Sequence, residues 1–215
     1  MSYFLNLDTW KRKAQFDFFR DYRQPFFNIC ANVDVSSLQR WTKEQGRSFF
    51  RSSLYLSTKA ANHVEEFCYR IRGESVIVHE KVHAGSTVLN EDETFSFCYF
   101  DFLEPFASFE KHVGDILEAH KRNMHVLDPR DDRDDLVHYS IIPWISFTSF
   151  KHARETGHED CIPKIVFGKY FEDRGKYQMP VSVEVHHALM DGIHAGKYFE
   201  TFQTYLNSAG DILRG

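Results

Sequence analysis

The sequence has few cysteines, and they are not clustered. The 215 residues contain four, scattered without a C-x-x-C pair or a spacing suited to zinc: Cys30, Cys68, Cys98 and Cys161. Isolated cysteines of this kind are typical of reduced, buried thiols. The pattern therefore predicts a cytoplasmic protein.

Basic runs and long apolar runs are also missing. The chain has 26 lysines and arginines against 31 aspartates and glutamates, a formal net charge of −5, so no strongly basic face can collect the phosphates of a duplex. No stretch approaches the length of a membrane span, and residues 1–9 lack the basic and apolar regions of a signal peptide. We expect neither a nucleic-acid partner, nor membrane insertion, nor export.

Aromatic residues, by contrast, are abundant. They make up 16% of the chain, with 21 phenylalanines, and hydrophobic residues reach 42%. A chain of this length and composition can build one substantial core. Because no internal repeat or low-complexity linker divides it, we expect a single domain over residues 1–215.

The expected elements mix helices with strands. Periodicity and capping residues predict helices at residues 10–23 (capped by Asp8 or Thr9), 36–46, 49–64, 106–122 and 193–206. β-rich segments predict strands at residues 26–35, 67–72, 75–78, 87–89, 94–102, 136–147, 164–171 and 177–187, antiparallel between 67 and 102 and with a hairpin turn at 173–176. Residues 128–135 and 151–160 read as loops, the first of them solvated. The order predicts an α+β fold, a mixed-sheet two-layer sandwich.

The most informative stretch is residues 181–192, where a strand leads into a turn and a helix. Three valines alternate with polar residues there, and continuing this period places His187 on the apolar face and His186 on the opposite one. Apolar neighbours disfavour the charged imidazole and keep a lone pair free, which suits a general base. On residue types alone, His187 is as readily a hydrogen-bonded core histidine, and Asp191 a turn residue or helix N-cap.

Other catalytic patterns have the wrong context. The HExxH pattern at residues 79–83 follows a strand, whereas zinc proteases need it on a helix, so we expect both histidines on a hairpin surface. A zinc site built from His186, His187, Asp191 and His194 is disfavoured because neighbouring strand residues point to opposite faces. No cysteine lies in a nucleophile turn, and Ser140 is not in a G-x-S-x-G elbow.

Four separate motifs resemble the chloramphenicol acetyltransferase family of CoA-dependent acyltransferases. They are HHxxxDG at residues 186–192, the aromatic and basic segment at 10–20, ETFS at 93–96 and SIIPW at 140–144. HHxxxDG alone is shared with other acyltransferases, including dihydrolipoyl acyltransferases, for which we would expect a lipoyl domain and linker that are absent here. The combination of motifs, spread over nearly the whole chain, is specific to the first family.

The resemblance implies a chemistry. It implies acetyl-CoA-dependent transfer of an acetyl group to a hydroxyl of chloramphenicol or a similar small acceptor, without a metal. His187 would be the general base, and Ser140 would donate a hydrogen bond to the tetrahedral oxyanion. Asp191 would form a structural ion pair with Arg12. Because the family is trimeric, the resemblance also implies a homotrimer with active sites at subunit interfaces.

The resemblance further implies substrate-binding residues. They are Phe18, Phe19 and Phe95 for the acceptor, and Lys169 and Tyr170 for CoA. Phe19 and Val166 stand where well-known members have a tyrosine and a threonine, so the departures concern the acceptor. The alternatives are an acyltransferase for a different hydroxyl or thiol acceptor, and a non-catalytic trimeric binding protein of the same fold.

Overall fold

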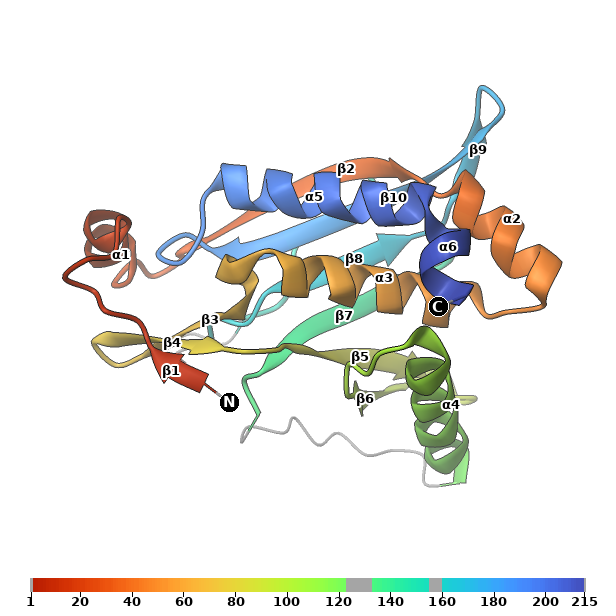
Figure 1. Cartoon of the computed structure of the whole chain (residues 1–215), viewed down its shortest axis with the longest axis horizontal. Helices are drawn as coiled ribbons and strands as arrows, with labels where there is room; N and C mark the ends of the chain where they lie inside the picture. Colours follow the sequence, from red (N-terminus) through yellow and green to blue (C-terminus); the bar gives the residue numbers. More distant parts are fainter. Residues whose placement is uncertain (1, 123–132, 155–159, 215) are drawn as a thin grey trace.

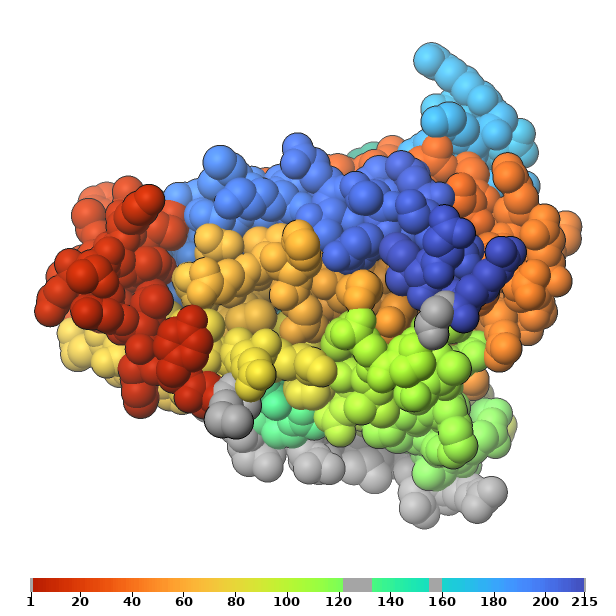
Figure 2. Space-filling view, in the orientation of Figure 1, coloured from red at the N-terminus to blue at the C-terminus, as the bar shows by residue number. Residues whose placement is uncertain are grey.

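The computed structural model describes residues 2–122, 133–154 and 160–214, and the statements below refer to this part of the chain. Two helices, α3 (Phe49–His63) and α5 (Gly192–Asn207), lie along one face of a seven-stranded sheet (Figure 1). In the space-filling view their side chains occupy the middle of this face of the molecule (Figure 2). The remaining helical elements are α1 (Lys13–Phe19), α2 (Ser36–Gln45), the short 3₁₀ helix η1 (Glu65–Cys68), α4 (Phe106–Arg122) and α6 (Ala209–Arg214).

The large sheet is mixed. Its strands follow the order β2-β10-β8-β7-β5-β6, with β9 paired to one end of β10. They are β2 (Phe26–Asp34), β5 (His83–Leu89), β6 (Phe95–Phe100), β7 (Leu136–Ile142), β8 (Lys164–Gly168), β9 (Phe171–Asp173) and β10 (Lys176–His186). The pairs β5–β7 and β7–β8 are parallel and the others antiparallel. A separate three-stranded sheet has the order β1 (Ser2–Phe4), β4 (Ser75–His79), β3 (Tyr69–Arg72).

The valines of β10 form the centre of the core. Val181, Val183 and Val185 are fully buried and belong to one hydrophobic cluster with Tyr198 and Phe202 of α5. Burying each such side chain stabilises the fold by roughly 1.5–3 kcal/mol relative to leaving it exposed. The strand that precedes the two histidines is therefore anchored from inside, and the mixed-sheet α+β prediction is confirmed.

The hairpin predicted at residues 173–176 is confirmed as well. It joins β9 to β10, and its two central residues, Arg174 and Gly175, have φ angles of 50° and 78°. Positive φ at both positions is the signature of the two-residue turn whose twist matches that of paired strands.

Two expectations were wrong. Helix α1 begins at Lys13 rather than residue 10, because the backbone N–H of Asp8 donates to the Asn6 side chain and this segment forms a separate turn. The prediction of antiparallel strands between residues 67 and 102 is confirmed: β3 pairs with β4 in the small sheet, and β5 pairs with β6 in the large one. His79 and His83 therefore lie in different sheets, not on one hairpin surface.

The remaining differences are smaller. Strand β1 and helix α6 were not expected. Of the charged residues 128–135, the first five lie outside the described residues, whereas Arg133 and Asp135 pair with each other at 2.9 Å and are partly buried rather than solvated. No helix in the described part of the chain is long and apolar enough to cross a membrane.

Candidate functional site

His187 lies in the turn immediately after β10. Its ring stacks on Phe19 with centroids 4.0 Å apart and an interplanar angle of 8°, and Phe27 contacts it from β2 at 4.8 Å. The ring nitrogen Nδ1 is 3.1 Å from the carbonyl oxygen of Met190. A carbonyl oxygen can only accept, so Nδ1 carries the proton and donates it. In the neutral ring Nε2 then carries the lone pair that a general base uses.

The two histidines differ in burial from what the strand period predicted. His186 is the last residue of β10 and is 5% exposed, whereas the His187 side chain is 35% exposed. The prediction of a desolvated His187 is thus wrong within the single chain, because the strand ends one residue earlier and its alternation stops there. Burial, with Arg154 nearby, lowers the pKa of His186 to about 4.

Arg12 and Asp191 are 179 residues apart in the sequence and form an ion pair. A second guanidinium nitrogen of Arg12 donates to the carbonyl oxygen of His187 at 3.1 Å. Asp191 also occupies the N-cap position of α5, and its backbone N–H donates to the His194 ring at 2.8 Å. The pair therefore connects the start of α1 to the turn that carries His187.

Ser140 lies far from His187 within one chain. It is on β7, in register with Val166 of β8, which in turn is opposite Ser182 of β10. Two strand spacings and five further residues along β10 separate Ser140 from His187, or about 19 Å. The Ser140 hydroxyl has no hydrogen-bond partner among the described residues.

Some of the predicted acceptor residues lie near His187 and the others near Ser140. Phe18 is 61% exposed and contacts Phe19 at 4.9 Å, beside His187. Phe95 is half exposed on β6, the edge strand two positions beyond β7, and so belongs to the Ser140 side. A single chain does not bring the two groups together.

Lys169 and Tyr170 line a second, largely apolar pocket of about 400 Å³. The Tyr170 ring contacts Phe49 of α3 at 5.2 Å and Tyr177 at 5.7 Å. The pocket lies between the N-terminus of α3 and the end of β8, and Ile141, the neighbour of Ser140, is part of its wall. It can hold a narrow, flexible apolar chain; Ser140, next to Ile141 on β7, points to the opposite face of the sheet.

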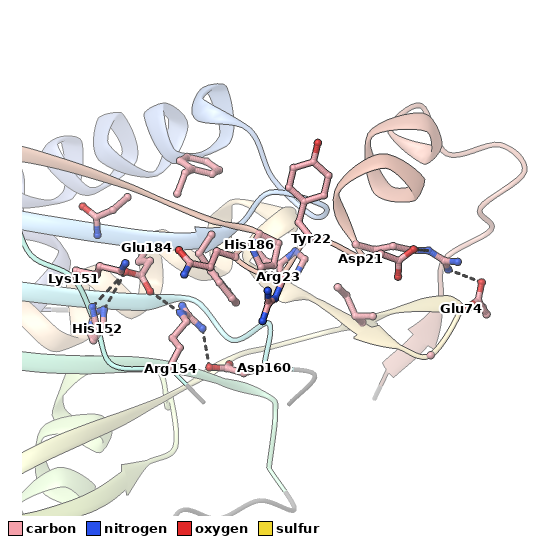
Figure 3. Close-up of a pocket in the computed structure, with 18 residues that line it drawn as sticks. Asp21, Tyr22, Arg23, Glu74, Lys151, His152, Arg154, Asp160, Glu184 and His186 are labelled. Carbon is pink, nitrogen blue, oxygen red and sulfur yellow. Dashed lines mark hydrogen bonds and ion pairs between the residues drawn. The ribbon is translucent and has the colours of Figure 1, made fainter. Parts of the chain in front are cut away.

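A larger pocket of about 920 Å³ opens at the His187 end of β10 (Figure 3). Its wall carries a charged group that the sequence analysis missed: Arg154 donates to Glu184 at 2.6 Å and to Asp160 at 2.7 Å. Arg154 and its neighbours were assigned to a polar loop, because their partners come from β10 and from a segment several residues away. The sequence did offer one indication of this group: Glu184 is a charged residue at a buried position of a strand, which requires a cationic partner.

Comparison with known proteins identifies the family. The profile described as chloramphenicol acetyltransferase matches residues 1–203. A chloramphenicol acetyltransferase of Campylobacter coli is 28% identical over 94% of this chain and 97% of its own length. A solved chloramphenicol acetyltransferase structure superimposes with a TM-score of 0.86 at 26% identity, covering 96% of this chain and 100% of that one.

A dihydrolipoamide acetyltransferase of Azotobacter vinelandii shares the fold more distantly. It has a TM-score of 0.70 at 13% identity, covering 88% of this chain and 84% of that one. The fold is thus that of the CoA-dependent acyltransferases. The profile match over nearly the whole chain identifies one family that has this fold. The chain belongs to the chloramphenicol acetyltransferase family.

Proposed function

We propose that this protein is an acetyl-CoA-dependent O-acetyltransferase that acts on a hydroxyl of chloramphenicol or a similar small acceptor. The relatives and the matching family carry the name of this activity. The observation that supports it most directly is the His187 imidazole, whose Nδ1 proton is engaged by the Met190 carbonyl while Nε2 keeps its lone pair. In this proposal the reaction needs no metal.

The reaction then follows from the two polar side chains. Nε2 of His187 takes the proton of the acceptor hydroxyl, and the oxygen attacks the thioester carbonyl of acetyl-CoA. The carbonyl oxygen becomes an oxyanion, to which the Ser140 hydroxyl donates a hydrogen bond. When the tetrahedral intermediate collapses, the C–S bond breaks, the acetyl ester leaves, and the His187 imidazolium returns its proton to the thiolate of CoA.

The apolar pocket next to Ile141 suits the coenzyme. Its walls of Phe49, Phe167 and Met179 match the uncharged arm of CoA. Lys169 and Tyr170 stand at the same pocket, where an ammonium group can attract the phosphates of the coenzyme.

The separation of Ser140 and His187 supports an assembly. Two groups about 19 Å apart cannot both contact one tetrahedral intermediate, so we place each active site between two copies of the chain, in a homotrimer. Phe18 and Phe19 would then face Phe95 of a neighbouring copy across the acceptor. We further propose one domain over residues 1–215 and a cytoplasmic location, which the four free cysteines support.

A thiol-release assay tests the proposal. With acetyl-CoA and chloramphenicol, we expect release of one CoA thiol for each acetyl ester detected by mass spectrometry. If CoA thiol is released only with another hydroxylated or thiol compound, that compound is the acceptor. CoA binding by calorimetry without thiol release from any acceptor would contradict it and indicate a binding protein of the same fold.

A further inference from the structure

The larger pocket adjoins His187 but uses a different histidine. Phe27 both contacts the His187 ring and lines this pocket, and Pro25, another lining residue, accepts the backbone N–H of His187 at 2.7 Å. The pocket therefore lies directly beside the proposed base. His186 is part of its wall (Figure 3).

The His186 ring presents an unused donor. Its Nδ1 accepts the backbone N–H of Ala188 at 3.2 Å, so the ring proton is on Nε2. The residue is 95% buried, and its ring is held edge-on against Phe26 at 4.9 Å. Nε2 has no hydrogen-bond partner among the described residues and is not one of their buried unpartnered atoms, so it is accessible to a ligand in the pocket.

Near neutral pH the His186 ring carries a single proton, on Nε2. Burial, together with the positive charge of Arg154, lowers the pKa of His186 to about 4. The imidazole is therefore neutral, with one fixed acceptor, Nδ1, and one fixed donor, Nε2. A donor of this kind recognises an oxygen with a lone pair, and carries no charge of its own.

The neighbouring charges are already compensated. Arg154 lies between Glu184 and Asp160, and Lys164 also reaches Asp160 at 3.0 Å. Two cations thus balance two carboxylates within this cluster, and the Arg154 guanidinium additionally stacks on Phe26, 3.3 Å from the ring centroid. Arg23 and Lys151 also line the pocket, but both are exposed to solvent, so the buried wall beside His186 fits an uncharged oxygen better than an anion.

We propose that His186 is an acceptor-binding residue, whose Nε2–H donates a hydrogen bond to an uncharged carbonyl oxygen of the molecule being acetylated. The proposal rests on the proposed function and specifies its substrate class: a hydroxyl compound that also carries an amide or ketone. His186 would hold the acceptor, and the adjacent His187 would act on its hydroxyl.

Paired variants test the hydrogen bond. His186→Phe keeps a ring without the donor, whereas His186→Gln keeps an N–H in a comparable position. His63→Gln, on the exposed end of α3, is the control. We expect His186→Phe to raise KM for chloramphenicol about tenfold, as for loss of one hydrogen bond, with kcat and KM for acetyl-CoA within about threefold of the wild type. His186→Gln should restore most of the loss.

Comparing two acceptor compounds tests whether His186 binds a carbonyl oxygen. Chloramphenicol carries an amide carbonyl that its deacylated amine lacks, and both keep the hydroxyls. His186→Phe should weaken binding of chloramphenicol and leave binding of the amine unchanged, measured by titration calorimetry in a His187→Ala background. Equal losses for both compounds, or none, would overturn the proposal.

Two further outcomes are separable. If His186→Phe changes the mass of the assembly in analytical ultracentrifugation and His186→Gln restores it, the residue serves a subunit contact and the proposal is wrong. If the wild type releases no thiol from any acceptor, the proposed function fails. The calorimetric comparison, which needs no turnover, still decides the role of His186.

Discussion

The tautomer of His187 depends on a backbone carbonyl three residues downstream. The Met190 oxygen is 3.1 Å from Nδ1, and the nearest Asp191 carboxylate oxygen is 3.3 Å from the same nitrogen. The carboxylate, however, is also paired with Arg12. Asp191 is therefore positioned to hold the turn, and the His187 ring orientation follows from the turn.

Replacing His187 with alanine should remove the base. We expect kcat to fall by at least about 10²-fold, the usual contribution of a positioned proton acceptor, while the assembly stays folded by circular dichroism. His186→Ala should keep appreciable kcat, because its Nε2 carries a proton and cannot accept one. Equal losses of kcat in the two variants, with both folded, would contradict the assignment.

Ser140→Ala should act on the transition state alone. An oxyanion donor contributes when charge develops, so we expect kcat to fall by about 10²–10³ with little change in either KM. Steady-state kinetics with both substrates varied are sufficient. A change confined to KM would show that Ser140 binds substrate instead. Ser146→Ala, in the same region but bonded to the Lys169 carbonyl at 2.7 Å, is a suitable control.

Buried histidines should make stability depend on pH. Burial lowers the pKa of His138 and of His186 from 6.5 to about 4. Between these values the unfolded chain binds more protons, so the stability they contribute is complete above about pH 6.5 and decreases as the pH falls toward 4. Each histidine should contribute a slope of up to about 1.4 kcal/mol per pH unit.

Urea unfolding at pH 7, 6 and 5 measures that slope. His186→Phe should reduce the slope of the free energy of unfolding against pH by the contribution of one histidine. Glu184 does not interfere, because its ordinary pKa of 4.5 is lowered to about 2 and its effect appears only below pH 4.5. A flat profile between pH 7 and 5 would show that neither histidine is held neutral.

Among the elements, helix α1 and the turn before α5 are joined mainly through Arg12 and Asp191. Arg12→Val and Asp191→Asn should each lower activity and stability, because each leaves a partly buried charge without its partner. The double variant should lose less than the sum of the two. Thermal unfolding of all four proteins gives the coupling. Additive losses would reduce Asp191 to a helix cap, typically worth about 0.5–2 kcal/mol.

Elements with a strong local pattern were predictable. The alternating valines fixed β10, and Gly46, with a φ of 62°, ends α2 where the sequence indicated. The parallel pairing of β7 with β5 and β8 was not predictable, because no local pattern specifies which strands meet. The same reason applies to the larger pocket, whose wall combines Arg154, Glu184 and His186 from separate segments. Motif resemblance named His187 and Ser140, but only the sheet register revealed their separation.

At the scale of the whole molecule, the proposed interface site can be tested by complementation. The variants His187→Ala and Ser140→Ala should each be nearly inactive as pure assemblies. If each site takes His187 from one copy and Ser140 from the next, refolding the two together at equal amounts should give about a quarter of the wild-type activity, since one arrangement in four pairs two intact residues. Activity no higher than that of the parents would place both residues in one chain.

The position of β10 also governs how the chain must be made. Among the described strands, β2, near the N-terminus, pairs only with β10, which lies near the other end of the sequence. While the ribosome is still adding the intervening residues, one edge of β2 has no partner, and the sheet cannot close until the histidine strand emerges. Non-local pairing of this kind is slow and exposes the nascent chain to aggregation. The last strand to be synthesised is thus the one that both completes the sheet and delivers the histidines.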